Sequence, residues 1–341
     1  MDRGYFTLQW HITNRCDQRC KHCYIYGTKK KITLFDVNVK NAENIIDKFI
    51  FFCKKIKRKP FINITGGDPL LHPFVWDILK LLSSKNIKFN ILGNPYHLDN
   101  VTVHNLKKLD CVNYQLSIDG LRKTHDNIRK ADSFDITLEK IKILKNNKIK
   151  VNIMSTVSKI NYHELPEVAR LVSTTGVDKY TFARYCPTDN DIEQSIPPFE
   201  YKQFLEKMYN VYSELSHCGT KFILKDHLWK LFFYERGEFR TMSDNNTVYD
   251  GCGCGINHIT LLEDGTVYAC RRFISPIGNI NDFDFYTIFF GEQLSYYRNI
   301  DNLEKCSKCE LFNYCRGCHA VSAGVYGDFF KPDPQCWKTI K

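Results

Sequence analysis

The first half of the chain alternates between short β-rich stretches and amphipathic helical stretches. Helical periodicity occurs at about 34–57, 73–86, 98–108, 134–147 and 163–175, and β-rich stretches lie at 5–13, 60–65, 88–92, 112–118, 149–156 and 178–183. Strands that alternate with helices are joined by crossovers and therefore pair in parallel. The sequence predicts an α/β fold whose six strands form either a barrel-like or a doubly wound sheet.

Unusual residues lie at the carboxyl end of each predicted strand. Cys16, Cys20 and Cys23 follow the first strand, and GGDP (66–69) follows the second. The later strands end in or are followed by GNP (93–95), SIDG (117–120), Ser155 with Thr156, and Arg184. Parallel strands present their carboxyl ends at one edge of a sheet, where βα-barrels build their sites. We therefore expect these residues to share one pocket.

Cysteine is unusually frequent, at fifteen of 341 residues. The N-terminus, MDRGYFTLQW, has no secretory apolar core, and no apolar run approaches the roughly 18 residues of a membrane span. We therefore expect a cytoplasmic protein without membrane contact, in which clustered cysteines bind metal rather than form disulfides. The net charge of +10 would suit an acidic partner, but the basic residues are scattered. We do not expect nucleic acid as a partner.

The loop CDQRCKHC has the spacing Cys-x3-Cys-x2-Cys, which supplies three thiols where a 4Fe–4S cube takes four ligands. With His22 before its last cysteine and Tyr24 after it, this loop resembles the radical S-adenosylmethionine (SAM) superfamily. The resemblance implies a partial (β/α)6 TIM-like barrel. It also implies an open iron that SAM chelates, and reductive cleavage of SAM to a 5′-deoxyadenosyl radical. The alternative is a zinc knuckle that recruits a distant fourth ligand.

The same resemblance implies SAM contacts at other strand ends. Gly66 and Gly67 would bring backbone close to SAM. Ser117 would donate to the ribose or the carboxylate, and Arg129 would pair with the carboxylate. The remaining residues of the predicted cofactor-binding set are His22, Tyr24, Asp68, Pro69, Asp119 and Ser155.

Eight cysteines gather near the C-terminus: Cys252, Cys254, Cys270, Cys306, Cys309, Cys315, Cys318 and Cys336. The array resembles the SPASM extension of radical SAM enzymes, which binds two auxiliary 4Fe–4S clusters. The resemblance implies an outer cluster held by Cys306, Cys309, Cys315 and Cys336, and an inner cluster held by Cys252, Cys270 and Cys318. Cys254 either completes the inner cluster or leaves an iron open to a substrate thiolate. Zinc ribbons are the alternative.

Three segments follow from these assignments: a radical SAM core at 1–190, a helical bridge at 191–250 and a small Cys-rich SPASM domain at 251–341. Within the last, 258–270 reads as two strands joined by an Asp264–Gly265 turn. This sequence departs from the family pattern in two features. Only two residues separate Cys315 from Cys318, where three are usual, and Arg271 stands where sulfatase-maturing relatives have a catalytic aspartate. Sulfatase maturation is therefore disfavoured.

Most radical SAM enzymes with a SPASM extension, which this chain resembles, oxidise or cross-link peptides. We expect an oxidoreductase that removes a hydrogen atom from a peptide carbon and closes a thioether with a cysteine sulfur. The opening QWHITNRCDQRCKHCYIY looks like the group paired with peptides bearing Ala-Cys-Gly repeats. Expected partners are an electron donor such as flavodoxin or ferredoxin and a separate leader-recognition protein, because few residues precede the first strand. Arg184 and Tyr185 are candidate catalytic residues by position.

Two other functions remain open. One is dehydrogenation of a small-molecule alcohol by the same radical chemistry, which would proceed without any peptide. The other is a non-catalytic iron–sulfur or zinc module, in which the glycines and the serine around the three-cysteine loop would have no task. Formation of 5′-deoxyadenosine from SAM and a reductant would discriminate the enzyme from the passive module.

Overall fold

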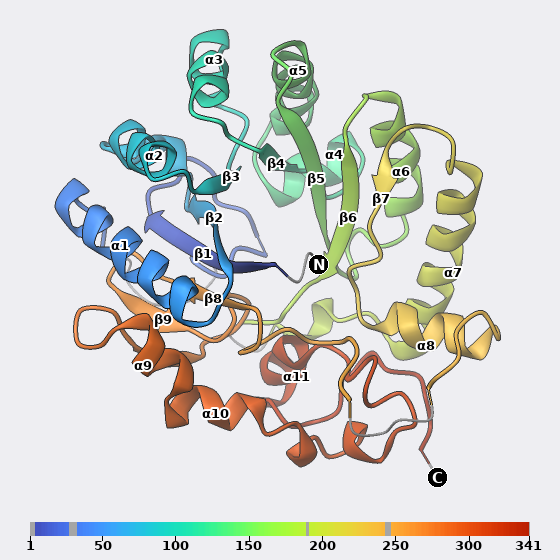
Figure 1. The fold of residues 1–341 in the computed structure, drawn as a ribbon. Helices are drawn as coiled ribbons and strands as arrows, with labels where there is room; N and C mark the ends of the chain where they lie inside the picture. Colours follow the sequence, from blue (N-terminus) through green and yellow to red (C-terminus); the bar gives the residue numbers. More distant parts are fainter. Residues whose placement is uncertain (1–3, 27–32, 189–190, 243–246, 341) are drawn as a thin grey trace.

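A computed structural model describes residues 4–26, 33–188, 191–242 and 247–340. The described residues form one ten-stranded sheet with the order β10-β9-β8-β1-β2-β3-β4-β5-β6-β7 (Figure 1). The six core strands are β1 (Tyr5–Thr13), β2 (Lys59–Gly66), β3 (Lys88–Leu92), β4 (Asn113–Ser117), β5 (Lys150–Val157) and β6 (Lys179–Arg184). Neighbouring core strands pair in parallel. The predicted α/β core is confirmed, and the sheet is curved but open.

Helices connect the core strands and pack on their outer side (Figure 1). They are α1 (Val39–Lys55), α2 (Val75–Ser84), α3 (Asn100–Lys108), α4 (Arg122–Ile128), α5 (Ser133–Asn146) and α6 (Leu165–Thr174). The first helix begins five residues later than predicted. Asn38 caps it by accepting a 2.8 Å hydrogen bond from the Asn41 amide, and Asp36 still pairs with Thr13 as a β-bridge. The sequence pattern missed α4, which is only seven residues long.

The segment after β6 adds helices and one short strand to the core. It contains α7 (Pro198–Glu214), β7 (Lys221–Phe222) and α8 (Leu228–Glu235). β7 pairs with β6, so this segment extends the sheet rather than only bridging two parts of the chain. Aromatic side chains fix it in place: the Phe182 ring lies 5.1 Å from Phe204 and 6.2 Å from Trp229.

The C-terminal part joins the other edge of the same sheet. β8 (His258–Leu261) pairs in parallel with β1, and β9 (Thr266–Tyr268) pairs antiparallel with both β8 and β10 (Pro276–Asn279). The predicted hairpin is therefore present, but its attachment to β1 was not predicted. The helices α9 (Phe285–Phe290), α10 (Glu292–Arg298) and α11 (His319–Tyr326) follow. In Figure 1 these residues, orange to red, run along the open side of the barrel towards α8.

Aromatic packing ties the C-terminal part to the core. The Phe6 ring of β1 lies 5.2 Å from Phe289 of α9, and Phe49 of α1 lies 5.6 Å from Phe285. All four side chains are buried, with exposed fractions of at most 7%. Among the described residues, no helix is long and apolar enough to cross a membrane.

Candidate functional site

The three-cysteine loop lines a cavity of about 200 Å³ at the carboxyl edge of the sheet. Cys16, Cys20 and Cys23 all lie on its wall. Of the predicted cofactor-binding residues, those that also line it are His22, Tyr24, Gly66, Gly67, Ser117 and Arg129. The structure thus brings together side chains from the ends of β1, β2 and β4, because parallel strands end at a common edge.

The two glycines of the GGDP motif hold the loop by its backbone. The Gly67 amide donates to Thr13 O at 3.0 Å, and the Asp68 amide donates to Arg15 O at 2.6 Å. A Cβ atom at Gly67 would lie 2.1 Å from Arg15 O, well inside van der Waals contact. Only glycine therefore permits this approach. Asp68 and Pro69 do not line the cavity; they begin the 3-10 turn at 69–71, where Asp68 accepts from the Leu70 amide at 3.2 Å.

Asp119 connects three parts of the site without reaching the cavity wall. Its fully buried carboxylate accepts from the Arg129 guanidinium at 2.6 Å and from the Thr156 amide at 2.7 Å, and the His22 ring lies 3.5 Å away. Burial alone would raise the pKa of Asp119, but Arg129 and the two neighbouring histidines hold it below its usual value. Arg129 also approaches Cys20 Sγ to 3.8 Å, so this ion pair fixes a cation beside the loop.

Ser155 does not line the cavity. Its buried hydroxyl donates to the Ile118 carbonyl and lies 3.1 Å from the Tyr180 hydroxyl, so it joins β4, β5 and β6. Tyr24 lies on the wall with its hydroxyl 3.2 Å from His11 Nε2. Ser117 therefore remains the predicted serine that faces the cavity.

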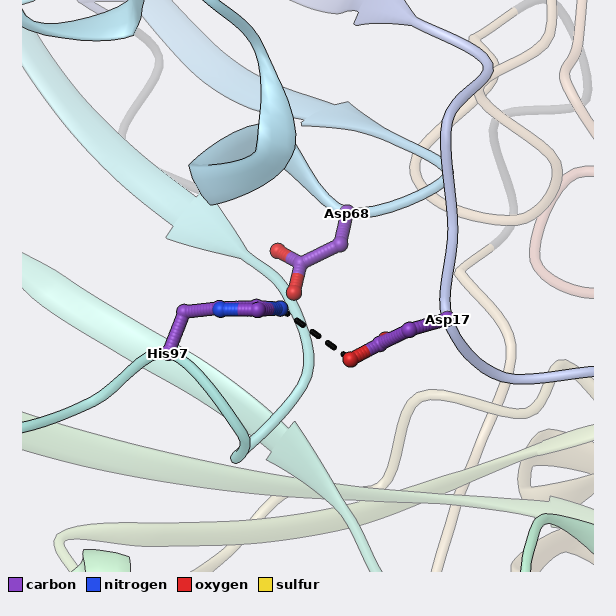
Figure 2. A group of neighbouring side chains, drawn as sticks. All are labelled: Asp17, Asp68 and His97. Atoms are coloured by element: carbon purple, nitrogen blue, oxygen red, sulfur yellow. Dashed lines mark hydrogen bonds and ion pairs between the residues drawn. The ribbon is translucent and has the colours of Figure 1, made fainter.

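Sequence reasoning missed a polar group behind the three-cysteine loop. Asp17, Asp68 and His97 converge from three different loops, and Figure 2 shows their side chains pointing toward one another. His97 Nε2 lies 3.0 Å from Asp17 Oδ2, and Asp68 is fully buried. Burial raises the pKa of Asp68 to about 7, and the Asp17 charge adds to this effect. Asn94 links the group to the loop, donating to Asp17 Oδ1 at 3.1 Å and to Cys16 Sγ at 3.3 Å.

The two candidate catalytic residues are held by other side chains. Arg184 lines the cavity but is 1% exposed, and its guanidinium donates to Asp226 and to Asp333, each at 2.7 Å. Tyr185 is also buried, and its hydroxyl donates to Asp191 at 3.0 Å. The contacts of Arg184 place it at the joint between the core and the C-terminal part, whereas the Tyr185 contact stays within the segment that follows β6; a catalytic role for either residue stays a prediction.

Four C-terminal cysteines surround a second, small pocket: Cys306, Cys309, Cys315 and Cys336. They come from 31 residues of chain in which α11 is the only α-helix that the structure describes, so loops shape most of the pocket. Four convergent thiols, none of them in a disulfide, are the donor set of a 4Fe–4S or zinc site. This is the set that the resemblance implied for the outer cluster.

The remaining C-terminal thiols form an inner group with Cys186. Cys252, Cys254, Cys270 and Cys318 lie close enough that their charges act on one another, and burial raises the pKa of Cys252 to about 12. Cys186, which follows β6, packs against Cys318 and lines the main cavity. Arg272 donates to Cys318 Sγ at 3.3 Å. Cys186 therefore adds a fifth thiol to this group through Cys318, and the spacing of the C-terminal cysteines alone could not reveal it.

Comparisons with known proteins agree with this arrangement. Residues 10–172 match the family described as "Radical SAM superfamily", and residues 252–319 match the one described as "Iron-sulfur cluster-binding domain" (SPASM). An AdoMet-dependent heme synthase of Methanosarcina barkeri is 26% identical, over 96% of this chain and 95% of the relative. The mycofactocin maturase MftC of Mycobacterium tuberculosis is 24% identical, over 96% and 82%.

The fold also matches solved structures. Streptococcus suis SuiB bound to S-adenosylmethionine superposes with a TM-score of 0.74 at 17% identity, covering 98% of this chain and 76% of SuiB. SuiB has also been solved with its precursor peptide SuiA. At this level of identity the likeness concerns the fold. The three-cysteine loop lies in the first matched region and most of the C-terminal thiols lie in the second, whereas Cys186 and Cys336 lie outside both.

Proposed function

Because the chain is a radical SAM enzyme with a C-terminal SPASM domain, we propose that it oxidatively modifies a cysteine-containing peptide and closes a thioether between a cysteine sulfur and a carbon. Its cofactors are S-adenosylmethionine and 4Fe–4S clusters. When bound, they supply the reductive cleavage that yields a 5′-deoxyadenosyl radical and a site that accepts an electron.

One observation carries the proposal. A single cavity has the three-cysteine loop on one wall, and Cys186, Arg271 and Arg272, which adjoin the inner thiol group, on another. A substrate in this cavity would contact the three-cysteine loop and the residues beside the inner thiol group. The residues of the chain then have separate tasks: the GGDP backbone holds the loop, Arg129 offers its charge beside Cys20, and Asn94 donates to Cys16 Sγ.

The donor sets fit the cofactors. We propose Cys16, Cys20 and Cys23 as ligands of the cluster that receives SAM, since three thiols leave one position for it. The four thiols of the second pocket would hold the outer cluster. The inner group would hold the third cluster. Cys254 lies close enough to Cys252 for their charges to interact, and would be its fourth ligand although two ligands separated by one residue strain the binding of a single cube. His22, Tyr24, Gly66, Gly67 and Ser117 would contact SAM.

The balance of the reaction defines the product. Forming a C–S bond from a C–H and an S–H bond removes two hydrogens, that is two electrons and two protons. One hydrogen atom goes to the deoxyadenosyl group, the thiol proton goes to solvent, and the remaining electron would go to the cluster that the inner group would hold. We propose that a flavodoxin or ferredoxin supplies the reducing electron in the cytoplasm, and that a separate protein recognises the leader. We keep the division into 1–190, 191–250 and 251–341 as a proposal.

The relatives give separate support to two substrate classes. The mycofactocin maturase and SuiB with its precursor peptide favour a peptide. The heme synthase, which aligns over nearly the whole chain, favours a small molecule as the second candidate. A small-molecule substrate, such as the alcohol considered above, predicts turnover in the absence of any peptide.

The test is anaerobic reconstitution with dithionite, SAM and synthetic peptides that contain Ala-Cys-Gly repeats. We expect 5′-deoxyadenosine together with a peptide product lighter by two hydrogens, in which the modified cysteine no longer reacts with iodoacetamide. A variant with alanine at Cys16, Cys20 and Cys23 serves as the control and should produce neither. SAM cleavage with every peptide mass unchanged would overturn the peptide proposal.

A further inference from the structure

Four arginines line the main cavity: Arg129, Arg184, Arg271 and Arg272. Arg129 and Arg184 form buried ion pairs with aspartates. Arg272 donates to Cys318 Sγ and to the Arg184 carbonyl. Arg271 differs from the other three, because it forms no ion pair within the residues that the structure describes. An arginine that is partly buried without a carboxylate partner carries a desolvation cost that a bound anion would offset.

No carboxylate among the described residues forms an ion pair with Arg271, although its charge also acts on the neighbouring Cys270 thiol and Glu263 acts on the same Tyr24 hydroxyl. Its guanidinium contacts the Tyr24 hydroxyl, and its charge acts on the rings of His11 and His258. Burial, with the Arg271 charge adding to it, lowers the pKa of His11 to about 3. Burial and nearby cations lower that of His258 to about 4. Both rings are neutral at pH 7, so neither histidine adds a charge beside Arg271.

A second cation approaches from the segment between β7 and α8. Lys225 is solvent-accessible and forms no ion pair within the described residues. Crowding by protein atoms, and then the charges of Arg271 and Arg272, lower the pKa of its amine to about 7. The thiols of Cys270 and Cys318 act on Lys225 in the opposite direction, and an anionic ligand would add to that effect.

We propose that Arg271 binds a carboxylate of the substrate and so selects an acidic substrate. This inference rests on the proposed function and names the chemistry that the site recognises. The other arginines already have tasks: Arg129 lies beside Cys20, and Arg272 lies on Cys318. A guanidinium can hold a carboxylate through two parallel hydrogen bonds, which would fix the substrate's orientation between the two thiol groups.

The first experiment needs no peptide. The reconstituted enzyme, loaded with SAM under anaerobic conditions, is treated with phenylglyoxal, which modifies accessible arginines, and the modified positions are mapped by mass spectrometry. We expect modification of Arg271 that 20 mM succinate suppresses and that 20 mM succinamide does not. The exposed Arg240 provides the internal control and should react equally in all samples. Equal modification of Arg271 with and without succinate, or no modification at all, would overturn the inference.

The second experiment separates this inference from the proposed function. Two matched pairs of fluorescent Ala-Cys-Gly peptides are titrated into the SAM-loaded enzyme. The first pair differs in a C-terminal carboxylate against a C-terminal amide, and the second in Glu against Gln within the repeat. We expect one of the acidic peptides to bind about tenfold to a hundredfold more tightly than its neutral match, which is typical of a charge-assisted hydrogen bond. The pair in which the acidic peptide binds more tightly shows whether the recognised carboxylate belongs to the C-terminus or to a glutamate side chain.

The variants complete the argument. In Arg271→Gln the acid and its neutral match should bind about equally, whereas Arg240→Gln, with the same change of charge, should keep the preference. Iron content and the EPR spectrum of the reduced Arg271→Gln protein should match wild type; loss of iron would instead assign Arg271 to the inner thiol group and refute its role in substrate binding. If peptides are converted without any preference for acids, this inference alone fails. If no peptide is converted while succinate still protects Arg271, the peptide proposal alone fails.

Discussion

Replacing Gly67 by alanine tests how the GGDP motif holds the three-cysteine loop. The added Cβ would lie 2.1 Å from Arg15 O, 2.6 Å from Arg15 C and 2.8 Å from Cys16 Cβ, whereas ordinary contact begins at 3.4 Å. The loop must therefore move by about 1.3 Å, the difference between 3.4 and 2.1 Å. The obstacle is backbone, so no side chain can rotate to relieve it.

The energetic cost follows from what the displacement breaks. Overpacking of this kind costs about 1–3 kcal/mol, and the two backbone hydrogen bonds to the loop are worth about 1 kcal/mol each. We expect Gly67→Ala to lose about 3–5 kcal/mol of unfolding free energy in urea, measured on the metal-free protein. It should also lose about four iron atoms per chain, one cluster's worth, and form no 5′-deoxyadenosine.

Gly176→Ala is the matched control. Its Cβ would meet open space, but its φ of +71° makes alanine strained by about 1–2 kcal/mol. It should lose stability while it keeps its full iron content and SAM cleavage. A Gly67→Ala protein with wild-type iron content and stability would refute the reasoning, because it would show that the loop does not need this close approach.

Three further predictions concern the polar contacts of the site. Arg129→Gln should cost about 3–5 kcal/mol at pH 7, because it leaves the buried Asp119 carboxylate unpaired. In the wild type, the lowered pKa of Asp119 stabilises the folded protein fully at pH values above the pKa of an unfolded aspartate. This stabilisation is lost as the pH falls through the lowered folded-state pKa. The variant should begin to lose stability at a higher pH than the wild type, which urea unfolding between pH 3 and 7 would show. Asn94→Ala removes the hydrogen bond to Cys16 Sγ, so the potential of the SAM-binding cluster, followed by EPR-monitored titration, should become more negative; an unchanged potential would contradict the contact. Arg184→Lys should lower the melting temperature and leave the pH profile of SAM cleavage unchanged, whereas a shifted profile at unchanged stability would support the predicted catalytic role of this residue.

The secondary structure of the core was predictable because it depends on local periodicity. The predicted strands at 5–13 and 88–92 coincide with β1 and β3. Each of the other core strands differs from its predicted range by one residue at each end. The start of α1 was wrong because the capping geometry at Asn38 and the bridge between Asp36 and Thr13, rather than apolar spacing, determine it. The pairing of β8 with β1 joins residues about 250 positions apart, and no local signal indicates it.

The sequence by itself determined the thiol spacing of the three-cysteine loop, the glycines that follow β2 and their meeting at one sheet edge. Those features follow from short segments and from the geometry of parallel strands. Only the tertiary structure decided which partner each charged or thiol side chain has. Arg184 pairs with an aspartate 149 residues away, Cys186 joins a thiol group built by the C-terminal part, and Arg271 forms no ion pair with any residue that the structure describes. Long-range packing sets these partnerships, because a charged or thiol side chain has no preferred neighbour until the strands and helices that carry it have docked.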